Sequence, residues 1–169
     1  MSSTLILGGA RSGKSAWAQG RAEAAGGRLV TVVTARALDA EMAQRIARHR
    51  ADRGGAWTTV EAPVDLTGAL ATLQPGDTAV VDCLTLWLSN LMHAEAELEP
   101  AFAALDAAVA GCPAQLLLVS NEVGQGIVPD NALARAFRDH AGCLHQRLAR
   151  TCDEAVLIVA GLPLWLKRA

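Results

Sequence analysis

Residues 4–15 read Thr4-Leu5-Ile6-Leu7-Gly8-Gly9-Ala10-Arg11-Ser12-Gly13-Lys14-Ser15. The apolar run 4–7 predicts a buried strand, and the helix-forming residues after Lys14 predict a helix over 14–25. The two glycines followed by Lys and Ser have the spacing of a phosphate-binding loop. A strand, a glycine turn and a helix N-terminus direct backbone N–H groups and the positive end of a helix dipole at one point, which favours a polyphosphate. The sequence therefore predicts a binding site for a nucleoside triphosphate.

Each part of this loop has an expected role. Lys14 is expected to reach the β- and γ-phosphates, and the Ser15 hydroxyl is expected to bind Mg²⁺. The residues expected to contact the nucleotide are Gly8, Gly9, Ala10, Arg11, Ser12, Gly13, Lys14 and Ser15.

The rest of the chain alternates short apolar runs with longer helical patterns, which is typical of a parallel sheet with helices on both faces. The predicted strands are 4–7, 29–34, 78–83, 115–120 and 155–160, with 57–60 as a weaker edge candidate. The predicted helices lie near 14–25, 39–53, 64–73, 84–93, 99–110 and 130–150. We therefore expect an α/β fold resembling the P-loop nucleotide-binding proteins, with residues 1–169 as one domain.

Composition limits the partners and the compartment. The net charge of −2 and the scattered basic residues predict no nucleic-acid partner, and a small molecule is favoured instead. No run approaches 18 apolar residues and no signal peptide is recognisable, so we expect no membrane span. The four cysteines lack the spacing of a zinc site, and we interpret them as reduced thiols of a cytoplasmic protein.

Polar residues follow three of the predicted strands, at the sheet edge where ligands of such folds collect. Thr34-Ala35-Arg36 follows the second strand, Asp82 closes the third, and Ser120-Asn121-Glu122 follows the fourth. Asp82 is the favoured second Mg²⁺ ligand, although it could instead cap the next helix. Glu122 could lie near the metal, near a substrate hydroxyl, or in the first turn of a short helix.

His49 is the candidate nucleophile. It lies in the predicted helix 39–53 among Arg45, Arg48, Arg50 and Arg53. Nearby cations lower the pKa of an imidazole and keep it neutral, and a neutral imidazole can attack phosphorus. A histidine in such a helix could also be an ordinary surface residue. His93, His140 and His145 have no comparable setting, and we assign them to surface or packing roles.

Several motifs together resemble one family, the bifunctional adenosylcobinamide kinases and adenosylcobinamide-phosphate guanylyltransferases of cobalamin biosynthesis. The residues that carry the resemblance are the loop 8–15, 39–42, 45–50 with Arg53, 57–61, 81–91, 120–130 and 134–142. The resemblance implies phosphorylation of the aminopropanol hydroxyl of adenosylcobinamide by ATP or GTP. It then implies transfer of GMP from GTP to the new phosphate, with release of pyrophosphate.

The resemblance also implies site residues. His49 matches the family histidine that becomes guanylylated, and Mg²⁺ would be held by Ser15 and Asp82. The further residues implied near the nucleotide are Thr34, Ala35, Arg36, Arg50, Ala51, Asp52, Arg53, Glu61 and Asp82. Some relatives carry Glu at position 82, and some carry a second His in place of Arg48, which leaves His49 as the candidate here. A homotrimer is implied as well.

Two other functions stay open at this point. One is a simple small-molecule kinase in which His49 is structural, because the phosphate-loop fold serves many acceptors. The other is a regulator whose bound triphosphate only switches a surface. Product formation from a corrinoid acceptor would exclude the regulator.

Overall fold

The structure, a computed structural model, describes residues 2–36 and 55–168. Within these residues the strands are β1 (Ser3–Gly8), β2 (Arg28–Val33), β3 (Trp57–Glu61), β4 (Asp77–Asp82), β5 (Gln115–Asn121), β6 (Glu154–Val159) and β7 (Leu162–Lys167). The helices are α1 (Lys14–Ala25), α3 (Leu66–Ala71), α4 (Leu84–His93), α5 (Leu98–Ala110) and α6 (Ala132–Thr151).

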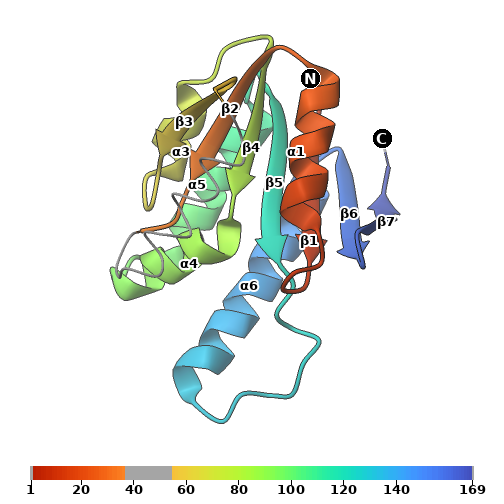
Figure 1. Ribbon diagram of the computed structural model, residues 1–169. Helices are drawn as coiled ribbons and strands as arrows, with labels where there is room; N and C mark the ends of the chain where they lie inside the picture. Colours follow the sequence, from red (N-terminus) through yellow and green to blue (C-terminus); the bar gives the residue numbers. More distant parts are fainter. Residues whose placement is uncertain (1, 37–54, 169) are drawn as a thin grey trace.

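The described strands form a seven-stranded sheet in the order β3-β2-β4-β5-β1-β6-β7. All neighbouring pairs are parallel except β6 with β7, which is antiparallel. The arrowheads of the central parallel strands therefore point to one edge of the sheet, as Figure 1 shows. The α/β fold with a mostly parallel sheet is confirmed.

Register brings several of the predicted polar residues to that edge. Gly8 pairs with Asn121, and Asp82 pairs with Val119 on the other side of β5. On the next strands, Asp82 pairs with Val33, and Val33 pairs with Glu61. The phosphate-loop start, the end of β5, Asp82 and Glu61 therefore lie along one carboxyl edge.

Both faces of the central strands β1, β4 and β5 are buried, and side-chain alternation along each strand decides which residue faces which helix. Leu5, Leu116 and Leu118 belong to the cluster under α3, α4, α5 and α6. Ile6 and Leu117 belong to the second cluster, under α1. Figure 1 shows α1 on one face and the other helices on the opposite face. This two-sided burial explains why the strands read as unbroken apolar runs.

Strand β7 is the element that the sequence prediction missed. It follows a two-residue turn in which Ala160 and Gly161 have φ of 51° and 79°, as in the tight turns that join antiparallel strands. Pro163 is tolerated because β7 is at the sheet edge. Trp165 packs edge-on against Trp17 of α1, with 6.0 Å between the ring centroids. This contact attaches the C-terminal strand to the helix that follows the phosphate loop.

Most predicted helices are present with shifted ends, because the capping residues set their starts. Helix α3 begins after Asp65, whose Oδ1 accepts from Gly68 N at 2.8 Å. Helix α6 begins after Asn131, whose Oδ1 accepts from Ala134 N at 2.7 Å. The predicted helix 39–53 lies outside the described residues. Among the helices of the described part of the chain, none is long and apolar enough to cross a membrane.

Candidate functional site

The loop between β1 and α1 has the conformation that its glycines permit. Gly13 is the N-cap of α1, with φ of 92°, and Arg11 also has a positive φ, of 56°. The Trp17 N–H donates to Gly13 O at 2.9 Å, which starts the helix. Lys14 is 9% exposed, and its Nζ donates to Gly9 O at 3.2 Å. The lysine ammonium therefore lies over the loop, where a phosphate would meet it.

The loop is also held from the side by the turn between β6 and β7. The Gly161 N–H donates to Ser12 O at 2.8 Å. A Cβ on Gly8 would lie 2.4 Å from Ser12 Oγ and 2.9 Å from Ile158 O. Ser12 Oγ is buried and has no hydrogen-bond partner among the described residues. The close packing of Gly8, Ser12 and Ile158 shows why the first glycine of the motif must lack a side chain.

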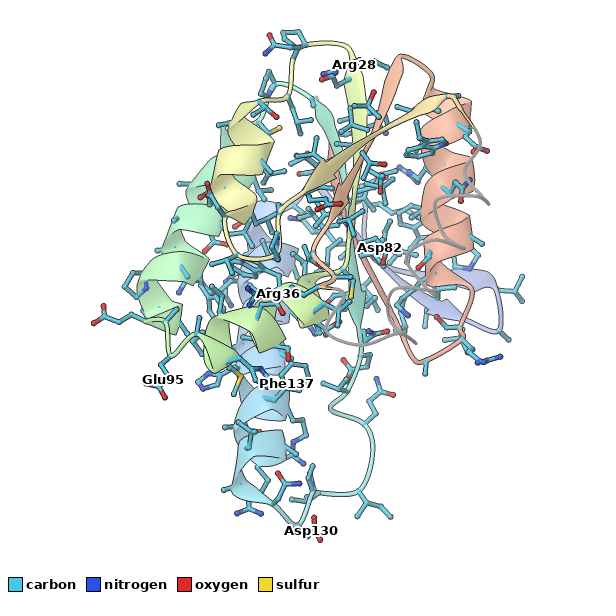
Figure 2. All side chains as sticks on the ribbon, turned by 60° about the vertical axis from the view of Figure 1, so that its left-hand side comes forward. Arg28, Arg36, Asp82, Glu95, Asp130 and Phe137 are labelled. Atoms are coloured by element: carbon cyan, nitrogen blue, oxygen red, sulfur yellow. The ribbon has the colours of Figure 1, made fainter. Side chains whose placement is uncertain are left out.

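Asp82 lies at the end of β4 near the middle of the sheet, as Figure 2 shows. The N-cap of the following helix α4 is Cys83, and it makes no side-chain capping bond. Burial and the charge of Asp82 raise the pKa of the Cys83 thiol, whereas the charge of Lys14 lowers it. Asp82 and Lys14 are therefore both close enough to act electrostatically on this thiol. The N-cap alternative for Asp82 is wrong, because Cys83 takes that position.

Thr34 connects the ends of β2 and β4. Its Oγ1 donates to Cys83 O at 2.7 Å and accepts from Cys83 N at 2.9 Å, and the side chain is fully buried. Asn90 of α4 donates from Nδ2 to Thr34 O and to Pro63 O, each at 2.8 Å. These bonds fix the backbone that leads to Ala35 and Arg36. Arg36 itself is exposed and lies close to α4 in Figure 2.

Glu61 ends β3, the outermost strand on its side of the sheet, and is exposed. It is separated from β1 by four strand spacings, which is about 19 Å at about 4.8 Å per spacing. At that distance a ligand with its phosphates in the loop could meet Glu61 only with its far end. The remaining predicted site residues, His49, Arg50, Ala51, Asp52 and Arg53, lie outside the described residues.

A polar cluster beyond β5 joins Ser120 and Glu122, which the sequence analysis places at this strand end, to His145, which it assigns to a surface or packing role. His145 of α6 is 7% exposed. Of the two roles expected for it, surface and packing, the buried position agrees with packing. Its Nε2 is 2.7 Å from Ser120 Oγ, and its Nδ1 is 4.0 Å from Glu122 Oε2. Burial lowers the pKa of His145, and the charge of Glu122 partly opposes this. The imidazole is therefore neutral near pH 7.

Glu122 is not in a helix, so that alternative is wrong: the chain from Glu122 to Asn131 is a loop, and α6 starts at Ala132. The Glu122 N–H donates to Gly8 O at 3.0 Å, which joins this loop to the first residue of the phosphate loop. Glu122 Oε1 accepts from the Gly124 N–H. The periodicity of hydrophobic residues could not have predicted that Ser120, Glu122 and His145 lie together, because they come from a strand end, a loop and a helix.

Two oxygen-bearing side chains at this edge are of the kind that Mg²⁺ binds together with a nucleotide. Ser15 supplies a hydroxyl at the start of α1, and Asp82 supplies a carboxylate at the end of β4. In the described ranges, no three His, Cys, Asp or Glu side chains are grouped as a metal site. Mg²⁺ needs no such group, since it is commonly held by one or two carboxylates, waters and the phosphates of the substrate.

Comparison with solved structures supports the fold. An ATPase from the type III secretion system of pathogenic bacteria matches with a TM-score of 0.57 and 9% identity, over 92% of this chain and 50% of that chain. The flagellar accessory protein FlaH from Methanocaldococcus jannaschii matches with a TM-score of 0.51 and 14% identity, over 99% of this chain and 78% of that chain. At these identities the likeness concerns the fold alone, and it confirms the expected resemblance to P-loop nucleotide-binding proteins.

Comparison with known sequences identifies the family as well as the fold. Residues 4–166 match the family described as cobinamide kinase / cobinamide phosphate guanyltransferase. The bifunctional adenosylcobalamin biosynthesis protein CobP of Pseudomonas aeruginosa is 45% identical over 166 residues, which are 96% of each chain. The bifunctional adenosylcobalamin biosynthesis protein CobU of Salmonella typhimurium is 40% identical over 179 aligned positions, covering 96% of this chain and 98% of the relative.

These matches run through the phosphate loop, Asp82 and the Ser120–Glu122 segment, and they cover nearly the whole chain. They show that the chain is an enzyme of the cobinamide kinase / cobinamide phosphate guanyltransferase type. The chain belongs to the cobinamide kinase / cobinamide phosphate guanyltransferase family.

Proposed function

We propose that this chain performs two successive reactions on one corrinoid substrate. It first transfers the γ-phosphoryl group of ATP or GTP to the aminopropanol hydroxyl of adenosylcobinamide. It then transfers GMP from GTP to adenosylcobinamide phosphate, giving adenosylcobinamide-GDP and pyrophosphate. The observation that carries the proposal is the phosphate loop at the carboxyl edge of the sheet, in a chain that matches this bifunctional family over residues 4–166.

In the kinase reaction, the loop N–H groups and Lys14 hold the phosphates and stabilise the charge that develops on the transferred group. The bond of Lys14 to Gly9 O supports this role, because it shows the ammonium lying over the loop. Mg²⁺, held by Ser15 and Asp82, would supply further neutralisation of phosphate charge.

In the guanylyl reaction, we propose that His49 is the nucleophile. Its imidazole attacks the α-phosphorus of GTP, pyrophosphate leaves, and a guanylyl-histidine forms. The phosphate of adenosylcobinamide phosphate then displaces the histidine. The phosphate loop would hold the leaving pyrophosphate with the same groups that hold the β- and γ-phosphates in the kinase reaction.

The nucleotide would extend from the loop across the carboxyl edge. Asp82 lies two strands from β1, and Glu61 lies four strands away. We therefore assign Glu61, Thr34, Ala35 and Arg36 to the nucleoside end of the nucleotide, and the loop to its phosphates. The hydroxyl of Thr34 is bonded to Cys83, and its backbone is bonded to Asp82 and Asn90, so Thr34 would act by holding the backbone of Ala35 and Arg36 in place. Arg50, Ala51, Asp52 and Arg53 complete the proposed nucleotide contacts.

The family resemblance further supports a homotrimer, and the unpaired cysteines support a reducing, cytoplasmic location. Cys83, Cys112, Cys143 and Cys152 all lie in the described residues and are free thiols. One domain spanning 1–169 agrees with the continuous family match.

Two measurements test the proposal. Incubation of the purified protein with adenosylcobinamide and ATP or GTP, followed by mass analysis, is expected to give the phosphate, and with GTP also the GDP-linked product. Incubation with α-labelled GTP alone is expected to leave acid-labile, base-stable label on the protein, located at His49 by peptide mapping. Active enzyme that never carries label would exclude the histidine intermediate in favour of direct transfer.

A further inference from the structure

The Ser120–His145–Glu122 cluster, defined by those three residues, lies outside the roles assigned so far and directly beside the phosphate loop. β5 lies between β1, which carries the loop, and β4, which carries Asp82. The Glu122 N–H donates to Gly8 O at 3.0 Å, so the backbone of Glu122 is bonded to the first loop residue. The Glu122 side chain is 22% exposed. A residue whose carboxylate has partial access to solvent is therefore bonded through its backbone to the start of the phosphate loop.

The two proposed reactions have different needs for a base. In the kinase reaction the acceptor is an alcohol, whose proton must leave as the oxygen attacks phosphorus. In the guanylyl reaction the nucleophiles are a neutral imidazole and a phosphate that is already anionic, so neither has to lose a proton to a protein group. A residue that accepts the hydroxyl proton is therefore required by only one of the two activities.

Resting on the proposed function, we infer that Glu122 is the proton acceptor of the kinase reaction and that His145 is the residue that positions it. The hydroxyl proton passes to the Glu122 carboxylate as the substrate oxygen bonds to the γ-phosphorus. The bond between that phosphorus and the β–γ bridging oxygen breaks, and its electron pair leaves with the nucleoside diphosphate. Lys14 and the loop N–H groups balance the charge of the leaving diphosphate.

Other carboxylates near the edge are less suited to this step. Asp82 is engaged as the proposed metal ligand, and Glu61 is four strands from the loop. Asp130 lies at the far end of the loop beyond β5, away from Asp82, as Figure 2 shows. Of the acidic residues along this edge that the structure describes, Glu122 is the one whose own backbone contacts the phosphate loop.

His145 is suited to hold the carboxylate because it is buried and anchored on its other side. Ser120 Oγ is 2.7 Å from Nε2, and a serine hydroxyl that donates there leaves the ring proton on Nδ1, on the side of Glu122 Oε2. Ser120 is itself fully buried in β5. The Gly124 N–H donates to Oε1 of Glu122, whereas Oε2 lies 4.0 Å from His145 Nδ1, so a small movement of the carboxylate would bring Oε2 within hydrogen-bond distance of the imidazole.

Glu122→Gln tests the inference with little change of shape. A glutamine Oε1 can still accept from the Gly124 N–H, so the loop keeps that bond. The matched control is Glu95→Gln, an exposed residue between α4 and α5 that Figure 2 shows far from Asp82. The kinase reaction is measured with adenosylcobinamide and ATP, and guanylyl transfer is measured separately with supplied adenosylcobinamide phosphate and α-labelled GTP.

The kinase kcat of Glu122→Gln is expected to fall about 10²- to 10⁴-fold, which is the range for loss of a general base. Guanylyl transfer is expected to stay at the level of Glu95→Gln. Equal loss of both activities, or an unchanged kinase kcat, would overturn the inference while leaving the proposed function intact. A wild-type protein without kinase activity would overturn both. A wild-type kinase without guanylyl transfer would refute only the second proposed reaction, and the two glutamine variants would still decide the role of Glu122.

His145→Gln tests the positioning role. It is expected to lower the kinase kcat more than guanylyl transfer and to leave the KM for ATP near that of the wild type. Parallel decreases of both activities together with the melting temperature would show that His145 is merely structural. If His145→Gln does not fold, the Glu122→Gln comparison still tests the proton acceptor. The positioning role is then tested with Ser120→Ala, which removes the hydrogen-bond partner of His145 Nε2.

Discussion

Gly8 is the loop residue whose replacement the structure predicts most sharply. A Cβ at this position would lie 2.9 Å from the backbone oxygen of Ile158 and 2.4 Å from Ser12 Oγ. The serine hydroxyl could rotate away, but Ile158 O belongs to β6, which is paired with β1 along its length. Gly8→Ala therefore forces β1, the loop or β6 to shift. Gly9→Ala is the matched control, because a Cβ there meets nothing within 4 Å.

The expected size follows from overpacking, which costs about 1–3 kcal/mol when a methyl group is forced into a close-packed site. For a chain of 169 residues, each kcal/mol lowers the melting temperature by about 2–4 °C, so Gly8→Ala should melt about 2–12 °C below the wild type. The assay is thermal unfolding of nucleotide-free protein, followed by titration with ATP. Gly9→Ala should melt close to the wild type. The reasoning is refuted if the two variants melt together, or if Gly8→Ala binds ATP as tightly as the wild type does.

Two further predictions concern the supports of the site. Asn90→Ala removes the donor to Thr34 O and Pro63 O, and urea unfolding should show the protein destabilised by about 1–3 kcal/mol. Asn90→Asp keeps the shape of the side chain but has no N–H to donate, so it should not restore the stability of the wild type. Arg28 and the Gln74 N–H lower the pKa of Asp77, so its contribution to stability is complete above the unfolded value near 3.9 and is lost as pH falls through the lower folded value. The free energy of unfolding should therefore be higher for the wild type than for Asp77→Asn at pH 7, and this difference should shrink below about pH 4. A difference that stays constant from pH 7 to pH 3 would contradict the role given to the Asp77 carboxylate.

The parallel sheet could be predicted from the sequence because its strands are buried on both faces. Val80 and Leu117 stand in short apolar runs of the kind that strands buried on both faces have. The phosphate loop could also be predicted, because its glycines, Lys14 and Ser15 lie within one short stretch of sequence. Strand β7 was missed because Pro163 interrupts it, although the Ala160-Gly161 turn before it was a usable signal.

The candidate site was predicted only where its residues are close in sequence or follow a strand. The position of Asp82 at a strand end could be predicted because it ends an apolar run. The pairing of Ser120 with His145, in contrast, joins residues 25 apart on different elements. The role of Thr34 was also beyond the sequence, because its hydroxyl bonds the backbone of Cys83, 49 residues away. Such contacts depend on how α4 and α6 pack on the sheet, and no local pattern encodes that packing.

The central claim is that one phosphate loop serves both reactions while His49 serves one. Its most direct test is the ratio of kinase to guanylyl-transfer activity in two variants, with each reaction assayed on its own supplied substrate. Lys14→Ala is expected to lower both activities by about 10²- to 10³-fold, the usual cost of losing one donor to a developing charge. His49→Ala is expected to lose guanylyl transfer and keep the kinase reaction. A Lys14→Ala protein that retains either activity, or a folded His49→Ala protein that loses both equally, would contradict the account.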